Sequence, residues 1–239
     1  MLIAVANKTS GMILDSGGVL IRPTSRRWFP FDGFEEAAAG QGLQWEAAAF
    51  EAALGVGVQL LDYEHRTPMT RVDAEVDLWI RYHEIVATEL GCDAPAEVAR
   101  ETVTRWRTRT PVEPFEWTVP VLSSLRARGI TVVVLSDAWP SLRDWYVDLG
   151  LDAYVHAMVI SAEEAMSKPD ERVFAKARAL LGDVDQAFFV DDWPGNVEAA
   201  NALGLTGIRL RPQGSTSHPG LVEIDDLRDL LDLMDRTRA

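Results

Sequence analysis

The stretch "MILDSGGVL", Met12 to Leu20, joins an apolar run to an aspartate and then to two glycines. The apolar run is short and predicts a buried strand over residues 11–15. Its last residue, Asp15, precedes Gly17 and Gly18. A carboxylate in this place turns the chain, binds a metal ion, or attacks a substrate at the edge of a sheet. The rest of the sequence bears on the choice among these interpretations.

Short apolar runs and helical stretches alternate through the second half of the chain. Strands are predicted at 130–136, 154–161, 186–191 and 206–211, and helices at 119–128, 140–149, 171–181 and 195–203. A glycine follows each helix, where the left-handed backbone conformation is common: Gly129, Gly150, Gly182 and Gly204. This alternation predicts an α/β fold, a doubly wound parallel sheet with helices on both faces. Such sheets bind ligands beyond the C-terminal ends of their strands.

Residues 23–114 have a different composition, with alanine-rich and amphipathic helical patterns. In the segment 71–91, five apolar residues lie close to one face of a helix: Val72, Val76, Trp79, Ile80 and Val86. We therefore expect 1–22 and 115–239 to form the α/β core domain, and 23–114 to form a helical cap subdomain inserted after the first strand.

Composition excludes several classes of function. The net charge of −14 among 239 residues argues against a nucleic-acid partner. The single cysteine, Cys92, excludes an internal disulfide and a cysteine-based zinc cluster. No apolar stretch approaches the ~20 residues of a membrane span, and the N-terminus lacks the pattern of a signal peptide. We expect a cytoplasmic protein without a membrane partner, either a monomer or a homodimer.

Polar side chains stand where the predicted strands end. Each has an ordinary structural explanation, as a turn residue, a helix cap or a solvated charge. Together they would meet at one edge of the sheet, which is where this architecture places ligands. We therefore expect a site built from Asp15, Ser136, Asp137, Lys168, Asp191 and Asp192.

This set of motifs resembles the haloacid dehalogenase superfamily of hydrolases, most of which are phosphatases. The first family motif is D-x-D-G-[VT]-[LI], and the chain has Asp15-Ser16-Gly17-Gly18-Val19-Leu20. The second is a strand that ends in serine or threonine, here Ser136, and the third is a lysine, here Lys168 before Pro169. The fourth, D-D-x-x-x-N, is Asp191-Asp192-Trp193-Pro194-Gly195-Asn196. Many members carry a helical cap in the place of 23–114.

The resemblance implies a phosphatase that acts on a small phosphorylated metabolite. Asp15 would attack phosphorus and form an aspartyl-phosphate that water later hydrolyses. Lys168 and the hydroxyl of Ser136 would hold phosphoryl oxygens, and backbone amides around Gly17, Gly18 and Asp137 would add an anion nest.

The resemblance also implies a Mg²⁺ ion, which binds hard oxygen ligands. Its protein ligands would be Asp15, the backbone carbonyl of Gly17, and Asp191 or Asp192. Asn196 would orient Lys168 or the acidic pair.

Gly17 departs from the family pattern. Phosphatases of the family usually have an aspartate at this position, which protonates the leaving oxygen, and general acid catalysis is typically worth ~10²–10⁴-fold. Either the substrate has a good leaving group, or water or a cap residue delivers the proton, or catalysis is slow or lost.

Two other functions stay open. A 2-haloacid dehalogenase of the same superfamily also lacks the second aspartate, but it needs no metal. A non-catalytic phosphate-binding or regulatory relative would bind without turnover. The segment 21–31 bears on substrate choice: Arg22, Arg26, Arg27 and Trp28 either grip a leaving group, or the arginines are solvated and Trp28 packs under the cap.

Overall fold

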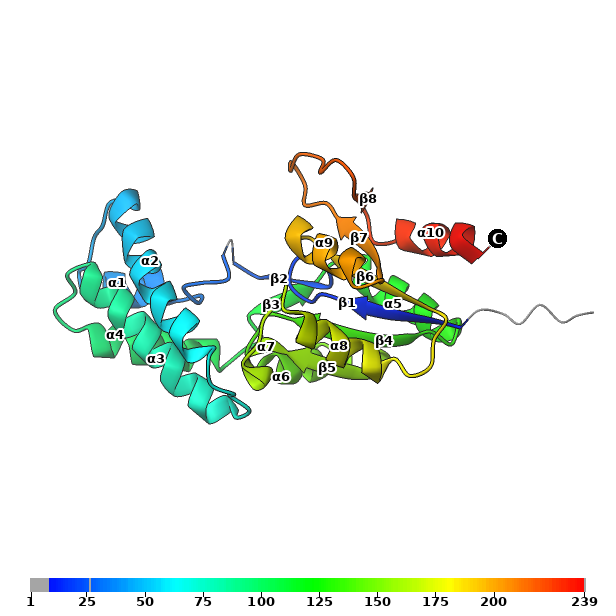
Figure 1. Cartoon of the computed structure of the whole chain (residues 1–239). Coiled ribbons are helices and arrows are strands. Elements are labelled where there is room, and N and C mark those ends of the chain that lie inside the picture. Colours follow the sequence, from blue (N-terminus) through cyan, green and yellow to red (C-terminus); the bar gives the residue numbers. More distant parts are fainter. Residues whose placement is uncertain (1–8, 26, 239) are drawn as a thin grey trace, which may run out of the picture.

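A computed structural model describes residues 9–25 and 27–238. Its centre is a six-stranded parallel sheet in the order β5-β4-β1-β6-β7-β8 (Figure 1). The predicted doubly wound α/β fold is confirmed. The strands are β1 (Ser10–Leu14), β4 (Thr131–Ser136), β5 (Ala157–Ile160), β6 (Gln186–Asp191), β7 (Thr206–Leu210) and β8 (Val222–Ile224).

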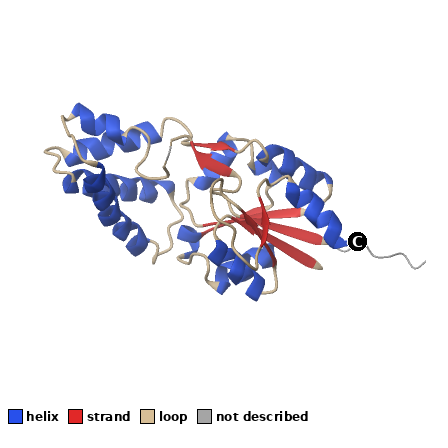
Figure 2. Cartoon of the chain, turned by 90° about the horizontal axis from the view of Figure 1, so that it is seen from above, coloured by secondary structure: helices blue, strands red, loops and turns tan. Residues whose placement is uncertain are grey.

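Helices cover both faces of the sheet (Figure 2). Successive residues of a strand point to opposite faces, and β1 follows this rule. Met12 and Leu14 pack with α5 (Thr118–Ala127), α6 (Leu142–Asp148) and α10 (Asp229–Arg238). Ile13 packs with α8 (Glu171–Leu180) and α9 (Pro194–Ala202) on the other face. Because β1 is central and buried on both sides, its C-terminal end lies at the middle of the sheet edge.

The prediction was wrong for parts of the C-terminal half. The strand expected at 154–161 is shorter, because a 3₁₀ turn occupies Asp152–Tyr154 and the short helix α7 occupies Ser161–Glu164. Strand β8 and helix α10 were not predicted. β8 has only three residues, which is too few for a periodic pattern to be visible. All four glycines expected after helices do have a positive φ.

The inserted segment contains α1 (Phe34–Gly40), α2 (Ala47–Glu64), α3 (Val72–Glu89) and α4 (Pro95–Trp106). These helices form a separate body beside the sheet (Figure 1), with their own aromatic and aliphatic core. Two short strands, β2 (Ile21–Pro23) and β3 (Val112–Pro114), pair antiparallel where the chain enters and leaves the cap. This ribbon was not predicted, because its partners are far apart in the sequence.

Polar contacts fix the cap against the core. The buried carboxylate of Glu75 on α3 accepts hydrogen bonds from the amide of Ser141 at 2.7 Å and from its hydroxyl at 2.6 Å. The same carboxylate accepts from Trp79 Nε1 at 2.9 Å. Trp139, from the loop after β4, packs within the aromatic core of the cap. The cap is therefore held over the C-terminal edge of the sheet.

His83 joins the chain that enters the cap to helix α3. Its Nε2 accepts a hydrogen bond from the amide of Phe31 at 3.1 Å, and Nδ1 lies 2.7 Å from the carbonyl of Trp79. The ring is therefore neutral, with its proton on Nδ1. Burial lowers the pKa of His83 to about 4, and the bond to Trp79 opposes this shift only in part.

This burial predicts a pH dependence of stability. The folded protein resists protonation of His83, whereas the unfolded chain does not. The contribution of neutral His83 to the free energy of unfolding is therefore complete above the unfolded pKa of about 6.5, and it is lost as the pH falls toward the folded pKa. Between pH 7 and pH 5, the wild type should lose about 2 kcal/mol more unfolding free energy than His83→Gln. Urea denaturation of both proteins at the two pH values measures this difference, and parallel losses would contradict it.

Candidate active site

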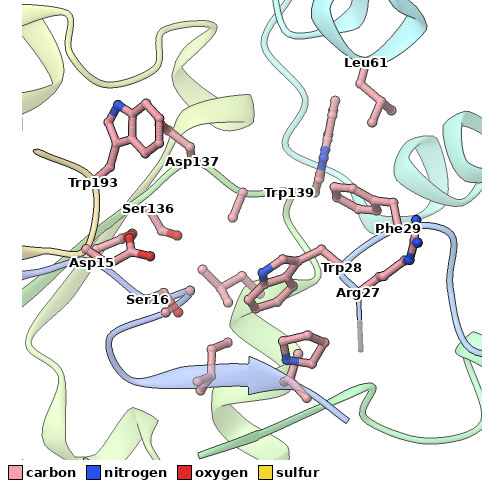
Figure 3. A pocket seen from close by; sticks show the side chains of 18 of the residues that line it. Asp15, Ser16, Arg27, Trp28, Phe29, Leu61, Ser136, Asp137, Trp139 and Trp193 are labelled. Atoms are coloured by element: carbon pink, nitrogen blue, oxygen red, sulfur yellow. The ribbon is translucent and has the colours of Figure 1, made fainter. Parts of the chain in front are cut away.

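The strand-end side chains meet at one place. All nine residues expected from the sequence line a single cavity of about 740 Å³ between the sheet edge and the cap (Figure 3). They are Asp15, Gly17, Gly18, Ser136, Asp137, Lys168, Asp191, Asp192 and Asn196. Parallel pairing explains the convergence. β1 lies between β4 and β6 in register, so the residues that follow these three strands emerge side by side.

Lys168 lies between two carboxylates. Its Nζ is 2.8 Å from Asp15 Oδ1 and 2.7 Å from Asp191 Oδ2, and the side chain is almost completely buried. Burial alone would lower the pKa of Lys168, but the carboxylates of Asp15, Asp191 and Asp137 hold it above its ordinary value. Lys168 is therefore a permanent cation within the site at neutral pH.

Neighbouring polar groups hold Lys168 and Asp191 in place. The backbone amide of Lys168 donates to Asp137 Oδ1 at 3.0 Å. Asn196 Nδ2 donates to Asp191 Oδ2 at 3.1 Å, and the amide of Trp193 donates to Asp191 Oδ1 at 2.8 Å. Asn196 thus contacts the acidic pair directly and fixes the carboxylate that in turn binds Lys168.

Among the described residues, acidic groups exceed cations in this buried space. Burial raises the pKa of Asp15, and the neighbouring Asp191 adds to the rise, while Lys168 opposes it. Burial likewise raises the pKa of Asp192, again with a contribution from Asp191. Carboxylates gathered in this way favour an additional cation.

The geometry fits a divalent metal ion. Carboxylate oxygens of Asp15, Asp191 and Asp192 all lie within 4.8 Å of one another. These are hard oxygen ligands of the kind that Mg²⁺ prefers. The three side chains come from the ends of β1 and β6, and they are the acids that the sequence analysis selected.

Gly18 is required by the loop in two ways. Its φ is +78°, a backbone conformation that residues with a side chain rarely adopt, and a Cβ atom at this position would lie 2.5 Å from Asp192 Oδ2. Its amide donates to the carbonyl of Ile21 at 2.9 Å. The turn therefore already uses the amide that the sequence analysis expected to bind phosphate. The amides of Gly17 and Asp137 stay candidates for the anion nest.

Trp28 lies against Gly17. A Cβ atom on Gly17 would be 3.0 Å from Cζ2 of the Trp28 indole and 3.4 Å from Cη2. The six-membered ring thus occupies the space into which an aspartate at position 17 would extend. Figure 3 shows the indole between the Asp15–Ser16 loop and Phe29. The sequence analysis weighed Trp28 as a residue that grips a leaving group or packs under the cap, but it did not connect Trp28 with the missing acid.

The arginines of the entering segment point to other partners. Arg22 pairs with Glu113 at 2.8 Å, and Arg27 pairs with Glu51 at 2.7 Å. Arg26 lies outside the described residues. The expectation that arginines grip a leaving group has no support from Arg22 or Arg27.

Two further side chains near the site were not predicted. His65, at the end of α2, lines the cavity, and its Nε2 lies 2.9 Å from Ser161 Oγ. Tyr146 on α6 is buried with its hydroxyl 2.9 Å from Ser16 Oγ, which holds the loop that follows Asp15. No local sequence signal marks either residue, because the hydroxyl that each contacts belongs to a residue far away along the chain.

Among the described residues, no helix combines the length and apolar character that crossing a membrane requires.

Curated phosphatases resemble the sequence. A glyceraldehyde 3-phosphate phosphatase of Methanopyrus kandleri is 27% identical over 168 residues, which cover 64% of this chain and 71% of that enzyme. A phosphoserine phosphatase of Thermus thermophilus is 29% identical over 156 residues, which cover 62% of this chain and 61% of that enzyme. The second match thus spans less than two thirds of the Thermus protein.

Solved structures with similar folds cover nearly the whole chain. A 2-haloacid dehalogenase of Pseudomonas syringae pv. Tomato DC3000 has a TM-score of 0.65 at 21% identity, over 95% of this chain and 99% of that one. The magnesium-bound YfnB protein of Bacillus subtilis has a TM-score of 0.64 at 11% identity, with the same coverage of both chains. At these identities the likeness concerns the fold. Residues 10–204 match the haloacid dehalogenase-like hydrolase family, and with its motifs gathered at one sheet edge under a helical cap, this chain belongs to that family of hydrolases.

Proposed function

We propose that this protein is a Mg²⁺-dependent phosphatase of a small phosphorylated metabolite and that Asp15 is its nucleophile. The observation that carries the proposal is the cluster of Asp15, Asp191 and Asp192 beside the buried ammonium of Lys168. A phosphate monoester brings two negative charges into this acidic place. It therefore requires both the lysine and a metal ion, and Mg²⁺ bound to the three acids would neutralise part of the phosphoryl charge.

The reaction has two steps. A carboxylate oxygen of Asp15 attacks phosphorus, the bond to the leaving oxygen breaks, and the electron pair departs on that oxygen, which takes a proton from solvent to give the alcohol. Water then attacks the phosphorus of the aspartyl-phosphate and gives up a proton to solvent, and the bond between phosphorus and the Asp15 oxygen breaks, which releases inorganic phosphate and restores the carboxylate. Lys168 and the Ser136 hydroxyl hold the phosphoryl oxygens in both steps. Asp137 holds the loop of Lys168 through the backbone.

The acidic cluster also separates this proposal from the dehalogenase alternative. A 2-haloacid carries a carboxylate, which the three acids would repel without a metal. The two curated relatives are named as phosphatases, which supports the same choice.

The test is an assay of phosphate release across about 100 phosphorylated metabolites, with Mg²⁺ and with EDTA. We expect release that depends on Mg²⁺ and is lost with the chelator. Halide release from 2-chloropropionate that ignores EDTA would identify a dehalogenase instead. Mg²⁺-dependent binding of phosphate analogues without any turnover would identify a non-catalytic relative.

A further inference from the structure

Beyond the cluster of Asp15, Lys168, Asp191 and Asp192, the cavity is lined mainly by aromatic and aliphatic side chains. Trp28, Phe29 and Leu61 come from the cap side, and Trp139 comes from the core (Figure 3). Trp28 is 38% exposed although its ring is large and apolar. Exposed apolar surface inside a cavity of ligand size indicates a binding surface.

Most of the described polar side chains in this part of the cavity are already engaged. Arg27 pairs with Glu51, and Asp32 accepts from the Thr24 hydroxyl at 3.0 Å. His65 is held by Ser161. A sugar or polyol leaving group would therefore find few free partners for its hydroxyls, and unpaired polar groups are costly to bury.

Asp62 adds a charge argument, since it also lines the cavity. Its carboxylate would repel a leaving group that carries a negative charge of its own. A neutral, apolar leaving group is favoured.

Among the described residues, the place of the missing aspartate at position 17 is taken by an indole ring and not by an acid. Trp28 fills the space in front of Gly17, and an indole ring does not protonate a leaving oxygen. The histidine that lines the cavity, His65, is a poor donor because burial lowers its pKa and Nε2 is held by Ser161. A leaving group that departs without protonation must be weakly basic. Phenols ionise near pH ~10, about six units below water, and so meet this requirement.

From the paired positions of Gly17 and Trp28, we infer that the leaving group is aromatic, so that the substrate is an aryl phosphate, and that Trp28 is the residue that selects it. This inference rests on the proposed function. Gly17 leaves room for the indole, and the indole offers a face or an edge to the departing ring. As the P–O bond breaks, the electron pair goes to the phenolate oxygen, which takes its proton from solvent.

The test separates leaving-group shape from leaving-group basicity. Phenyl phosphate and hexafluoroisopropyl phosphate release alcohols of similar acidity, but only the first is planar and aromatic. With Mg²⁺, the wild type should show a kcat/KM for phenyl phosphate about 10-fold above that for the fluoroalkyl ester, a preference of the size expected for an aromatic contact. Trp28→Ala should reduce the preference to within about 2-fold, whereas Trp28→Phe should retain most of it.

Trp45→Ala is the matched control, because Trp45 packs in the cap on Phe34 and Phe50 and does not line the cavity. It should keep the wild-type preference. Equal rates for the two esters in the wild type, or an unchanged preference in Trp28→Ala, would overturn the inference.

A binding measurement distinguishes failure of this inference from failure of the proposed function. Calorimetry with phenylphosphonate and methylphosphonate needs no turnover. If phenylphosphonate binds more tightly than methylphosphonate and Trp28→Ala abolishes this difference, the inference is supported even when every ester is inert. Inert esters would then refute the phosphatase activity alone. Equal binding, or no binding of either phosphonate, refutes the aromatic site.

Discussion

Replacing Asp15 by asparagine should abolish turnover, with a loss of about 10⁴-fold or more, as seen when a group that forms a covalent bond is removed. The amide has nearly the same shape as the carboxylate but is a poor nucleophile toward phosphorus. In the wild type the carboxylate lies at the end of the central strand, 2.8 Å from the ammonium of Lys168.

Rapid-quench kinetics with an aryl phosphate measures this effect directly. The wild type should release phenol before phosphate as the aspartyl-phosphate accumulates, and Asp15→Asn should show neither the early phase nor steady release. Circular dichroism should show that the variant is folded, because Lys168 keeps its contact with Asp191. Phosphate release at the wild-type rate from the folded variant would remove Asp15 from the nucleophile's role.

Replacing Lys168 by methionine should have two large effects. The reaction should slow by about 10²–10³-fold, because a preorganised cation no longer faces the phosphoryl oxygens. The metal-free protein should also lose about 3 kcal/mol of unfolding free energy, because Asp15 and Asp191 are left buried without their cation. Mg²⁺ should restore part of this loss by binding the folded state.

Lys176→Met is the matched control for this variant. Lys176 is also a lysine in an ion pair, with Glu164, but its side chain is about half exposed. Its removal should cost at most about 1 kcal/mol and leave the rate unchanged. Thermal unfolding and phosphate release of both variants, with and without Mg²⁺, measure these differences in stability and rate. Equal stabilities for the two variants, or near-normal turnover by Lys168→Met, would show that the buried cation does not have this role.

The fold was predictable where its signals are local. Apolar runs such as 130–136 and 186–191, with helices between them, indicate a parallel sheet, and the sheet then places the strand ends together. Asp15, Ser136 and Asp191 could therefore be assigned to one site before any contact was known. Their motifs are short and lie next to strands, so neighbouring residues carry the information.

Other features were not predictable, because they depend on contacts across the chain. Strands β2 and β3 are three residues each and pair over a separation of about 90 residues. The buried bonds between Glu75 and Ser141 join the cap to the core and leave no periodic trace in the sequence. The engagement of the Gly18 amide with Ile21 also follows from the shape of the turn.

The sequence by itself determined which polar side chains gather at the C-terminal edge of the sheet, because a residue that follows a buried strand keeps its position whatever the cap does. It also revealed that position 17 lacks an acid. Only the tertiary structure decided what stands there instead, since the path of the entering segment and the packing of the cap bring the Trp28 ring to within 3.0 Å of where a Cβ would be. Side-chain identity follows from the sequence, but the space around a side chain is set by residues that are distant along the chain.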